Sequence, residues 1–115
     1  MTETTQFDLS EYEFYPVVLV DEIPDGERLF VDINDKPVVI LNIRGEFFAM
    51  ADVCTHDDGP LGDGMLDDHQ IICPRHGARF DVRTGTALTL PAVLDAPVYP
   101  VRVVNGQVEI GVKKS

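Results

Sequence analysis

Apolar residues occur along this chain in short runs, and each run ends at residues that favour turns. The runs are rich in Val, Ile, Leu and Phe, which favour strands. No window repeats apolar residues with the 3.6-residue period of a helix without an interrupting Gly or Pro, so no helix is predicted. The pattern predicts an all-β sandwich or barrel. Strands are expected at Tyr15–Val20, Leu29–Ile33, Val38–Ile43, Glu46–Val53, Gln70–Cys73, Arg79–Val82, Val98–Val104 and Gln107–Val112.

Two of these strand pairs are separated by dipeptides that are typical of tight hairpin turns. Arg44-Gly45 lies between two apolar runs, and Asn105-Gly106 lies between the last two. The Asn-Gly pair favours a turn in which both central residues have positive φ, because Gly has no Cβ and Asn tolerates this region better than most residues. Both dipeptides therefore predict antiparallel hairpins.

The length of 115 residues fits one domain, with no repeat and no linker inside it. We expect residues 1–10 to be a flexible N-terminus and residues 11–115 to form the domain. The N-terminus lacks the basic start and apolar stretch of a signal peptide. No apolar run approaches the roughly 20 residues of a membrane span. A soluble, cytoplasmic protein is expected.

The chain is acidic, with a formal net charge of −11. Such a charge disfavours nucleic acid and anionic membranes as partners, and favours a protein with a basic patch. Part of the acidity could serve partner docking or only solubility, and the sequence leaves both readings open. Between residues 51 and 70 there is no Lys or Arg, and the acids are Asp52, Asp57, Asp58, Asp63, Asp67 and Asp68.

The residues with the clearest chemistry lie in two segments. One reads Cys54-Thr55-His56, and the other reads Cys73-Pro74-Arg75-His76. In a reducing compartment two cysteines indicate metal binding or catalysis rather than a disulfide. Two thiolates and two imidazoles can hold a [2Fe–2S] cluster with two Cys on one iron and two His on the other. A zinc site is the alternative, although zinc sites usually take both Cys from one segment and both His from another.

This pattern resembles the Rieske family, whose motif is C-x-H followed after a spacer by C-x-x-H. The resemblance extends to Gly45–Met50, Gly85, Leu90–Ala92 and Tyr99–Val101. It implies an antiparallel β-sandwich or barrel of the Rieske type, with a two-loop cluster-binding subdomain at about residues 53–82. It also implies one [2Fe–2S] cluster, held by Cys54, His56, Cys73 and His76.

Departures from the family pattern indicate the subclass. Rieske proteins that oxidise quinols carry two further Cys, where this chain has Gly59 and Arg75, and they are tethered by an N-terminal membrane segment. They also carry Ser and Tyr hydroxyls that bond to cluster sulfurs, where this chain has Ala78 and Phe80. Such bonds stabilise the reduced cluster, so we expect a potential near the low end of the Rieske range, roughly −150 mV.

Catalytic oxygenase subunits of the family need a further iron, held by two His and a carboxylate. Only His69 remains beside the predicted ligands, and we expect it at the surface. The chain thus resembles a soluble Rieske ferredoxin, a one-electron carrier between a flavin-dependent reductase and a terminal oxygenase. No catalytic residue and no small-molecule substrate are predicted. The alternatives are a ferredoxin serving cluster assembly or another redox pathway, and a non-redox binding module stabilised by metal.

Overall fold

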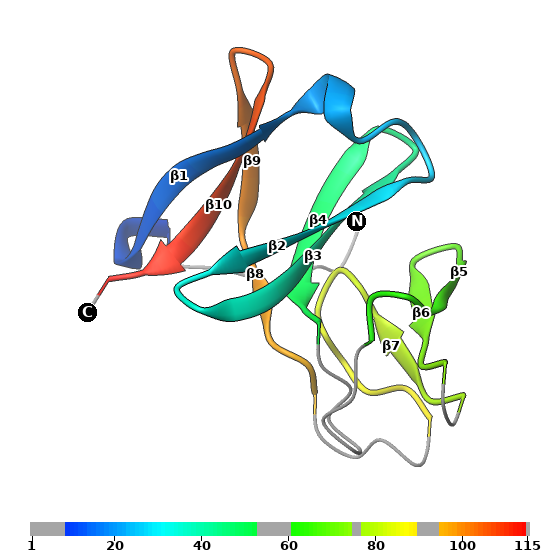
Figure 1. The fold of residues 1–115 in the computed structure, drawn as a ribbon. Coiled ribbons are helices and arrows are strands. Elements are labelled where there is room, and N and C mark those ends of the chain that lie inside the picture. Colours follow the sequence, from blue (N-terminus) through cyan, green and yellow to red (C-terminus); the bar gives the residue numbers. More distant parts are fainter. Residues whose placement is uncertain (1–8, 53–60, 75–76, 90–94, 115) are drawn as a thin grey trace, which may run out of the picture.

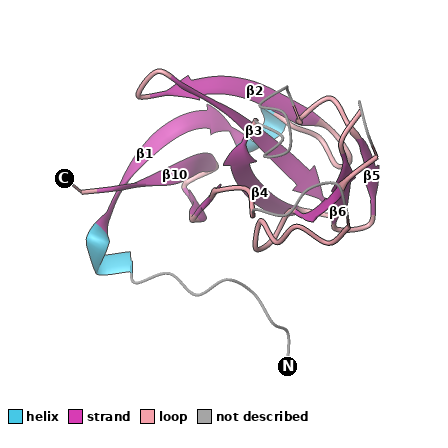
Figure 2. Ribbon diagram, turned by 90° about the horizontal axis from the view of Figure 1, so that it is seen from below, coloured by secondary structure: helices cyan, strands magenta, loops and turns pink. Residues whose placement is uncertain are grey.

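The computed structural model describes residues 9–52, 61–74, 77–89 and 95–114. Within these ranges it is built almost entirely of antiparallel strands (Figures 1 and 2). The two helical elements there are single 3₁₀ turns, η1 (Leu9–Glu11) and η2 (Val20–Glu22), neither of which could span a membrane. The strands are β1 (Tyr12–Leu19), β2 (Arg28–Ile33), β3 (Lys36–Ile43), β4 (Glu46–Ala51), β5 (Met65–Asp67), β6 (Gln70–Ile72), β7 (Arg79–Asp81), β8 (Val98–Tyr99), β9 (Val101–Val104) and β10 (Gln107–Lys113).

The first sheet has the order β1-β10-β9 and brings the two ends of the described chain together. Tyr12 pairs with Lys113, and the Lys114 amide donates to the Glu11 carbonyl at 2.8 Å. The predicted Asn105-Gly106 turn is confirmed. Its residues have φ values of 53° and 77° and join β9 to β10.

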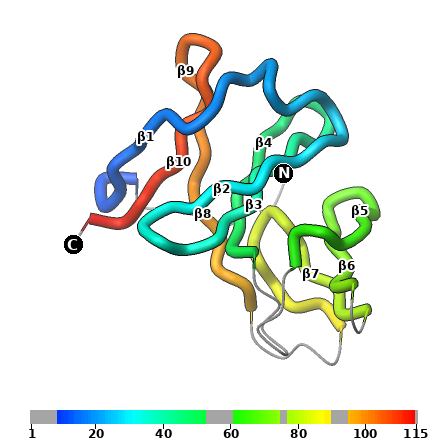
Figure 3. The backbone as a smooth tube through the Cα atoms, viewed as in Figure 1, coloured from blue at the N-terminus to red at the C-terminus, as the bar shows by residue number. Residues whose placement is uncertain are grey.

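The predicted strand Val98–Val104 is two strands, because Pro100 interrupts it. Proline has no amide hydrogen and cannot donate to a ladder. Before it, β8 pairs with β4, and after it, β9 pairs with β10. Figure 3 shows this orange segment passing from one sheet to the other.

The second sheet has the order β2-β3-β4-β8, and its central strand β3 lies between two hydrophobic cores. All residues from Val38 to Ile43 are buried, so the strand is covered on both faces. Val38 and Ile40 pack into a core with Val108 and Ile110 of the first sheet. The alternate residues, Val39 and Leu41 among them, pack into a second core shared with the third sheet. The near-continuous apolar run in the sequence is explained by this double burial.

The third sheet, β5-β6-β7, is small and lies at one end of the second (Figure 1). Leu66, Ile71 and Phe80 stand opposite one another in its ladder, and all three contribute to the second core. The next row, Met65, Ile72 and Arg79, faces away from that core, because successive side chains of a strand point to opposite faces. Strand β5 was not predicted from the sequence.

Candidate metal centre

Cys73 is the one predicted ligand that lies within the described residues. It directly follows β6, and its side chain belongs to the second core, where the residue is 1% exposed. Cys54, His56 and His76 lie outside the described residues. The four-ligand assignment therefore stays a prediction, and the structure describes the framework from which the two segments extend.

Backbone hydrogen bonds join the described residues that flank positions 75 and 76, at the end of β6 and before β7. The Cys73 amide donates to the Ala78 carbonyl at 2.7 Å, and the Gly77 amide donates to the Cys73 carbonyl at 3.0 Å. Gly77 has a φ of 76°, which lets the chain turn back toward β7. The described residues on either side of positions 75 and 76 are thus joined to one another by backbone hydrogen bonds.

The segment with Cys54 and His56 also has its described ends in well-packed structure. It leaves the second sheet after Ala51 and Asp52, and the described chain resumes at Leu61. Leu61 is fully buried and belongs to the same core as Cys73. Described residues next to both predicted ligand segments therefore pack into one hydrophobic core. A cofactor held between two loops needs such a shared support.

Ala78 and Phe80, which replace hydroxyl-bearing residues of the quinol-oxidising class, lie beside this framework. Both side chains are fully buried, and both belong to the core that contains Cys73. Neither can donate a hydrogen bond. The core that contains Cys73 therefore has apolar side chains at the two positions where the quinol-oxidising class has hydroxyl groups.

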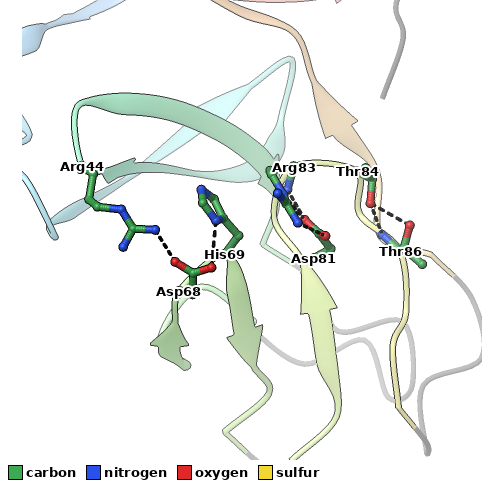
Figure 4. A network of polar contacts seen from close by, with 7 residues as sticks. All are labelled: Arg44, Asp68, His69, Asp81, Arg83, Thr84 and Thr86. Atoms are coloured by element: carbon green, nitrogen blue, oxygen red, sulfur yellow. Dashed lines mark hydrogen bonds and ion pairs between the residues drawn. The ribbon is translucent and has the colours of Figure 1, made fainter. Parts of the chain in front are cut away.

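His69 is not the exposed residue expected from the sequence. Its side chain is 16% exposed, and its ring meets that of Phe48 edge to face at a centroid distance of 5.7 Å. Nδ1 lies 3.2 Å from the Asp68 carboxylate, and Figure 4 shows ion pairs on both sides of the ring. No local signal predicts this packing, because Phe48 lies on another sheet.

Ion pairs hold the turn before β6 against the second sheet. Arg44, in the β3–β4 turn, donates to Asp68, in the β5–β6 turn. The hydrogen bond from Arg44, followed by that from His69, lowers the pKa of Asp68.

On the outer face of the third sheet, Arg79 donates to both Asp67 and Gln70 at 3.0 Å. Two of the acids considered for docking are thus engaged within the protein.

A third ion pair lies at the end of β7. Arg83 donates to the Asp81 carboxylate through its side chain at 2.9 and 3.1 Å, and through its amide at 2.8 Å. Burial raises the pKa of Asp81, but these hydrogen bonds outweigh burial, so that the pKa lies below its ordinary value. Because Asp81 follows Phe80, this pair fixes the strand that leads away from the cysteine loop.

In this small β protein Cys73 and Leu61, which follows the Cys-x-His segment, share one core, and two such Cys/His segments are typical of an iron–sulfur electron carrier. The Rieske [2Fe-2S] domain family matches residues 13–100, and the chain belongs to this family. The donor set of two thiols and two imidazoles fits the mixed ligation of such a cluster. The predictions of family, fold and a single [2Fe–2S] cluster are confirmed.

Curated relatives and solved structures agree with this assignment. The chain is 39% identical over 89 residues to the ferredoxin component of the naphthalene 1,2-dioxygenase/salicylate 5-hydroxylase systems of Ralstonia sp., covering 77% of this chain and 86% of the relative. It is similar to the ferredoxin of carbazole 1,9a-dioxygenase from Nocardioides aromaticivorans IC177, with 28% identity and a TM-score of 0.80, over 84% of this chain and 95% of that one. A complex of reduced oxygenase and oxidised ferredoxin in carbazole 1,9a-dioxygenase matches with 29% identity and a TM-score of 0.80, over 89% and 95% of the two chains. The prediction of an electron carrier rather than an enzyme is confirmed.

Proposed function

We propose that this chain carries single electrons from a flavin-dependent reductase to a terminal oxygenase. The observation that carries the proposal is its similarity to a ferredoxin found in complex with its oxygenase. The Ralstonia relative is likewise the ferredoxin component of a dioxygenase system. The proposal places the protein in the cytoplasm, as one domain from residue 11 to residue 115.

The proposed ligands are Cys54 and Cys73 on one iron and His56 and His76 on the other. The cluster, when bound, supplies reversible one-electron chemistry. The contribution of the chain is to hold the ligands in place. Cys73 does this from a buried position in the second core, and side chains in protein cores are close-packed. Ala78 and Phe80 withhold hydroxyl donors, which favours a low potential.

Spectroscopy of protein purified without oxygen tests the ligand assignment. The protein is expected to be reddish-brown, and the reduced form to give an electron spin resonance signal with an average g below that of an all-Cys cluster. Cys54→Ala and Cys73→Ala are expected to lose the cluster. His69→Gln is the matched control for His56→Gln and His76→Gln, and it is expected to keep the signal. A colourless protein that holds one zinc per chain would overturn the proposal.

Rapid-mixing kinetics test the partner assignment. Chemically reduced protein is mixed with a ring-hydroxylating oxygenase whose own Rieske centre is oxidised, and absorption changes follow the electron. Saturable transfer is expected, with a rate that rises with the oxygenase concentration and then levels off at a bound complex. If the protein is reduced reversibly but transfers no electron to any oxygenase tested, while it does reduce a cluster-assembly component, the alternative redox role holds.

A further inference from the structure

Residues 61–64, which follow the segment with Cys54 and His56, are held by two charged side chains. The Asp52 carboxylate accepts hydrogen bonds from the amides of Leu61, at 2.9 Å, and of Gly62. The Arg28 guanidinium donates to the carbonyls of Gly64, at 2.6 Å, and of Gly62. One side chain thus holds the amides of this short segment and the other holds its carbonyls. Hydrogen bonds with an ionised partner are roughly twice as strong as neutral ones.

The same segment is packed too closely for side chains at its two glycines. A Cβ on Gly62 would stand 2.6 Å from Cε2 of Phe30 and 2.9 Å from the Asp52 carboxylate. A Cβ on Gly64 would stand 1.9 Å from the carbonyl oxygen of Ile72. The segment therefore lies against β2 on one side and against β6 on the other. Ile72 directly precedes Cys73, so the segment joins the bases of the two ligand-bearing loops.

The two clamping residues are themselves fixed to the second sheet. Arg28 begins β2 and pairs with Leu41 of β3. Asp52 follows β4, and its amide donates to the Pro37 carbonyl at 3.0 Å. Asp52 lies two residues before Cys54, and its carboxylate accepts the hydrogen bond from Leu61, where the described chain resumes. Asp52 therefore links the two described ends of the chain on either side of residues 53–60. Bringing the ends of a loop together reduces the conformations open to the residues between them.

We propose that Asp52 and Arg28 are positioning residues of the metal centre. They clamp residues 61–64 and so fix the Cys54–His56 segment relative to Cys73. The inference rests on the ligand assignment proposed above. Sequence reasoning missed both residues. Asp52 was counted only as one of six acids, and a bond from its side chain to distant backbone amides leaves no local pattern.

The experiment compares Asp52→Ala, Asp52→Asn and Arg28→Gln with wild type, all purified anaerobically with the cluster bound. The first measurement is the rate at which iron passes to a chelator, and the second is the electron spin resonance spectrum of the reduced protein. Asp52→Ala is expected to release iron about tenfold faster, with shifted or broadened g values. Asp52→Asn is expected to be intermediate, because its amide oxygen can still accept both bonds without the charge.

Two matched variants serve as controls. Asp63→Ala removes an exposed carboxylate from the same segment, and Arg102→Gln removes an arginine that pairs with Glu109 on the first sheet. Both are expected to keep the release rate and g values of wild type. A merely structural role for Asp52 would lower the melting temperature while leaving the g values unchanged.

Wild-type release rates and spectra in both Asp52→Asn and Arg28→Gln would overturn the clamp, whether or not Asp52→Ala folds. Failure of the ligand assignment has a different signature, since Cys54→Ala would then keep the wild-type spectrum. The two proposals can thus fail separately.

Discussion

Gly85 and Ala96 lie in direct backbone contact at the end of the second core. The Ala96 amide donates to the Gly85 carbonyl at 2.7 Å. A Cβ at position 85 would stand 1.9 Å from the Ala96 carbonyl oxygen. Gly85 also has a φ of 80°, so both its conformation and its space exclude a side chain. This contact holds the chain after β7 against the segment that leads into β8.

Gly85→Ala is therefore expected to destabilise the protein strongly. Gly45 provides the control, because it has a φ of 89° but no atom within 4 Å of the position of a Cβ. Gly45→Ala should cost about 1–2 kcal/mol for its backbone conformation alone, and Gly85→Ala about 3 kcal/mol or more, since the clash is added. Denaturant unfolding of the two variants measures the difference. Equal losses would show that the contact at Ala96 relaxes freely.

Restoring hydroxyl groups near Cys73 is expected to raise the reduction potential. Ala78→Ser and Phe80→Tyr each add a donor in the core that contains Cys73. A donor to a cluster sulfur stabilises the reduced state, and a bond of ordinary strength corresponds to a shift on the order of 50 mV. Protein-film voltammetry of the two variants and of wild type measures the shift. Ala78→Val, which adds volume without a donor, is the control. An unchanged potential in both hydroxyl variants would contradict the hydrogen-bond explanation of the low potential.

The Asp81–Arg83 pair predicts a loss of stability in acid. The pKa of Asp81 is lower in the folded protein than in the unfolded chain, so unfolding takes up a proton. The stability that the lowered pKa of Asp81 contributes is fully present when the pH is above the ordinary pKa range of aspartate. It is lost as the pH falls through that range toward the lowered pKa of the folded protein. Urea unfolding of wild type and Asp81→Asn between neutral and acidic pH measures it. The variant should lose less stability on acidification, and Arg83→Gln should flatten the dependence in the same way. Parallel curves for all three proteins would contradict this.

Charge reversal beside the predicted His56 ligand tests the docking role of the acidic segment. Asp57→Lys with Asp58→Lys is expected to slow electron transfer at low salt and to weaken its salt dependence, because surface attraction is screened over about 8 Å at physiological ionic strength. Asp67→Lys is a useful comparison, since Asp67 already pairs with Arg79. Transfer rates to the oxygenase over a range of salt concentrations measure the effect. An unchanged salt dependence would assign these acids to solubility alone.

The features predicted correctly from sequence are those with local causes. The predicted Arg44-Gly45 and Asn105-Gly106 turns depend on two adjacent residues each, and the residues of both turns have positive φ, as was expected for the Asn-Gly pair. Strand β3 was predicted from its apolar run, and the structure shows that this run is buried on both faces of the strand. The ligand assignment also comes from residue types at short spacing, and it stays a prediction because three of the four residues lie outside the described part of the chain.

The features missed depend on distant partners. Strand β5 has three residues and exists through its pairing with β6. The residues on the two sides of Pro100 pair with two different sheets. His69 is covered by Phe48, which precedes it by more than twenty residues along the chain. Pairings of this kind are fixed by the three-dimensional fold, and no pattern of neighbouring residues contains them.

The pairing of Tyr12 with Lys113 has a practical consequence for measurements on this protein. Both ends of the described chain lie at the same end of the first sheet, away from the third sheet (Figure 1). A tether that continues from either strand would attach the molecule to an electrode by the same end of this sheet. The sheet that carries Cys73 would then face the solution, so an immobilised sample could still exchange electrons with a dissolved oxygenase.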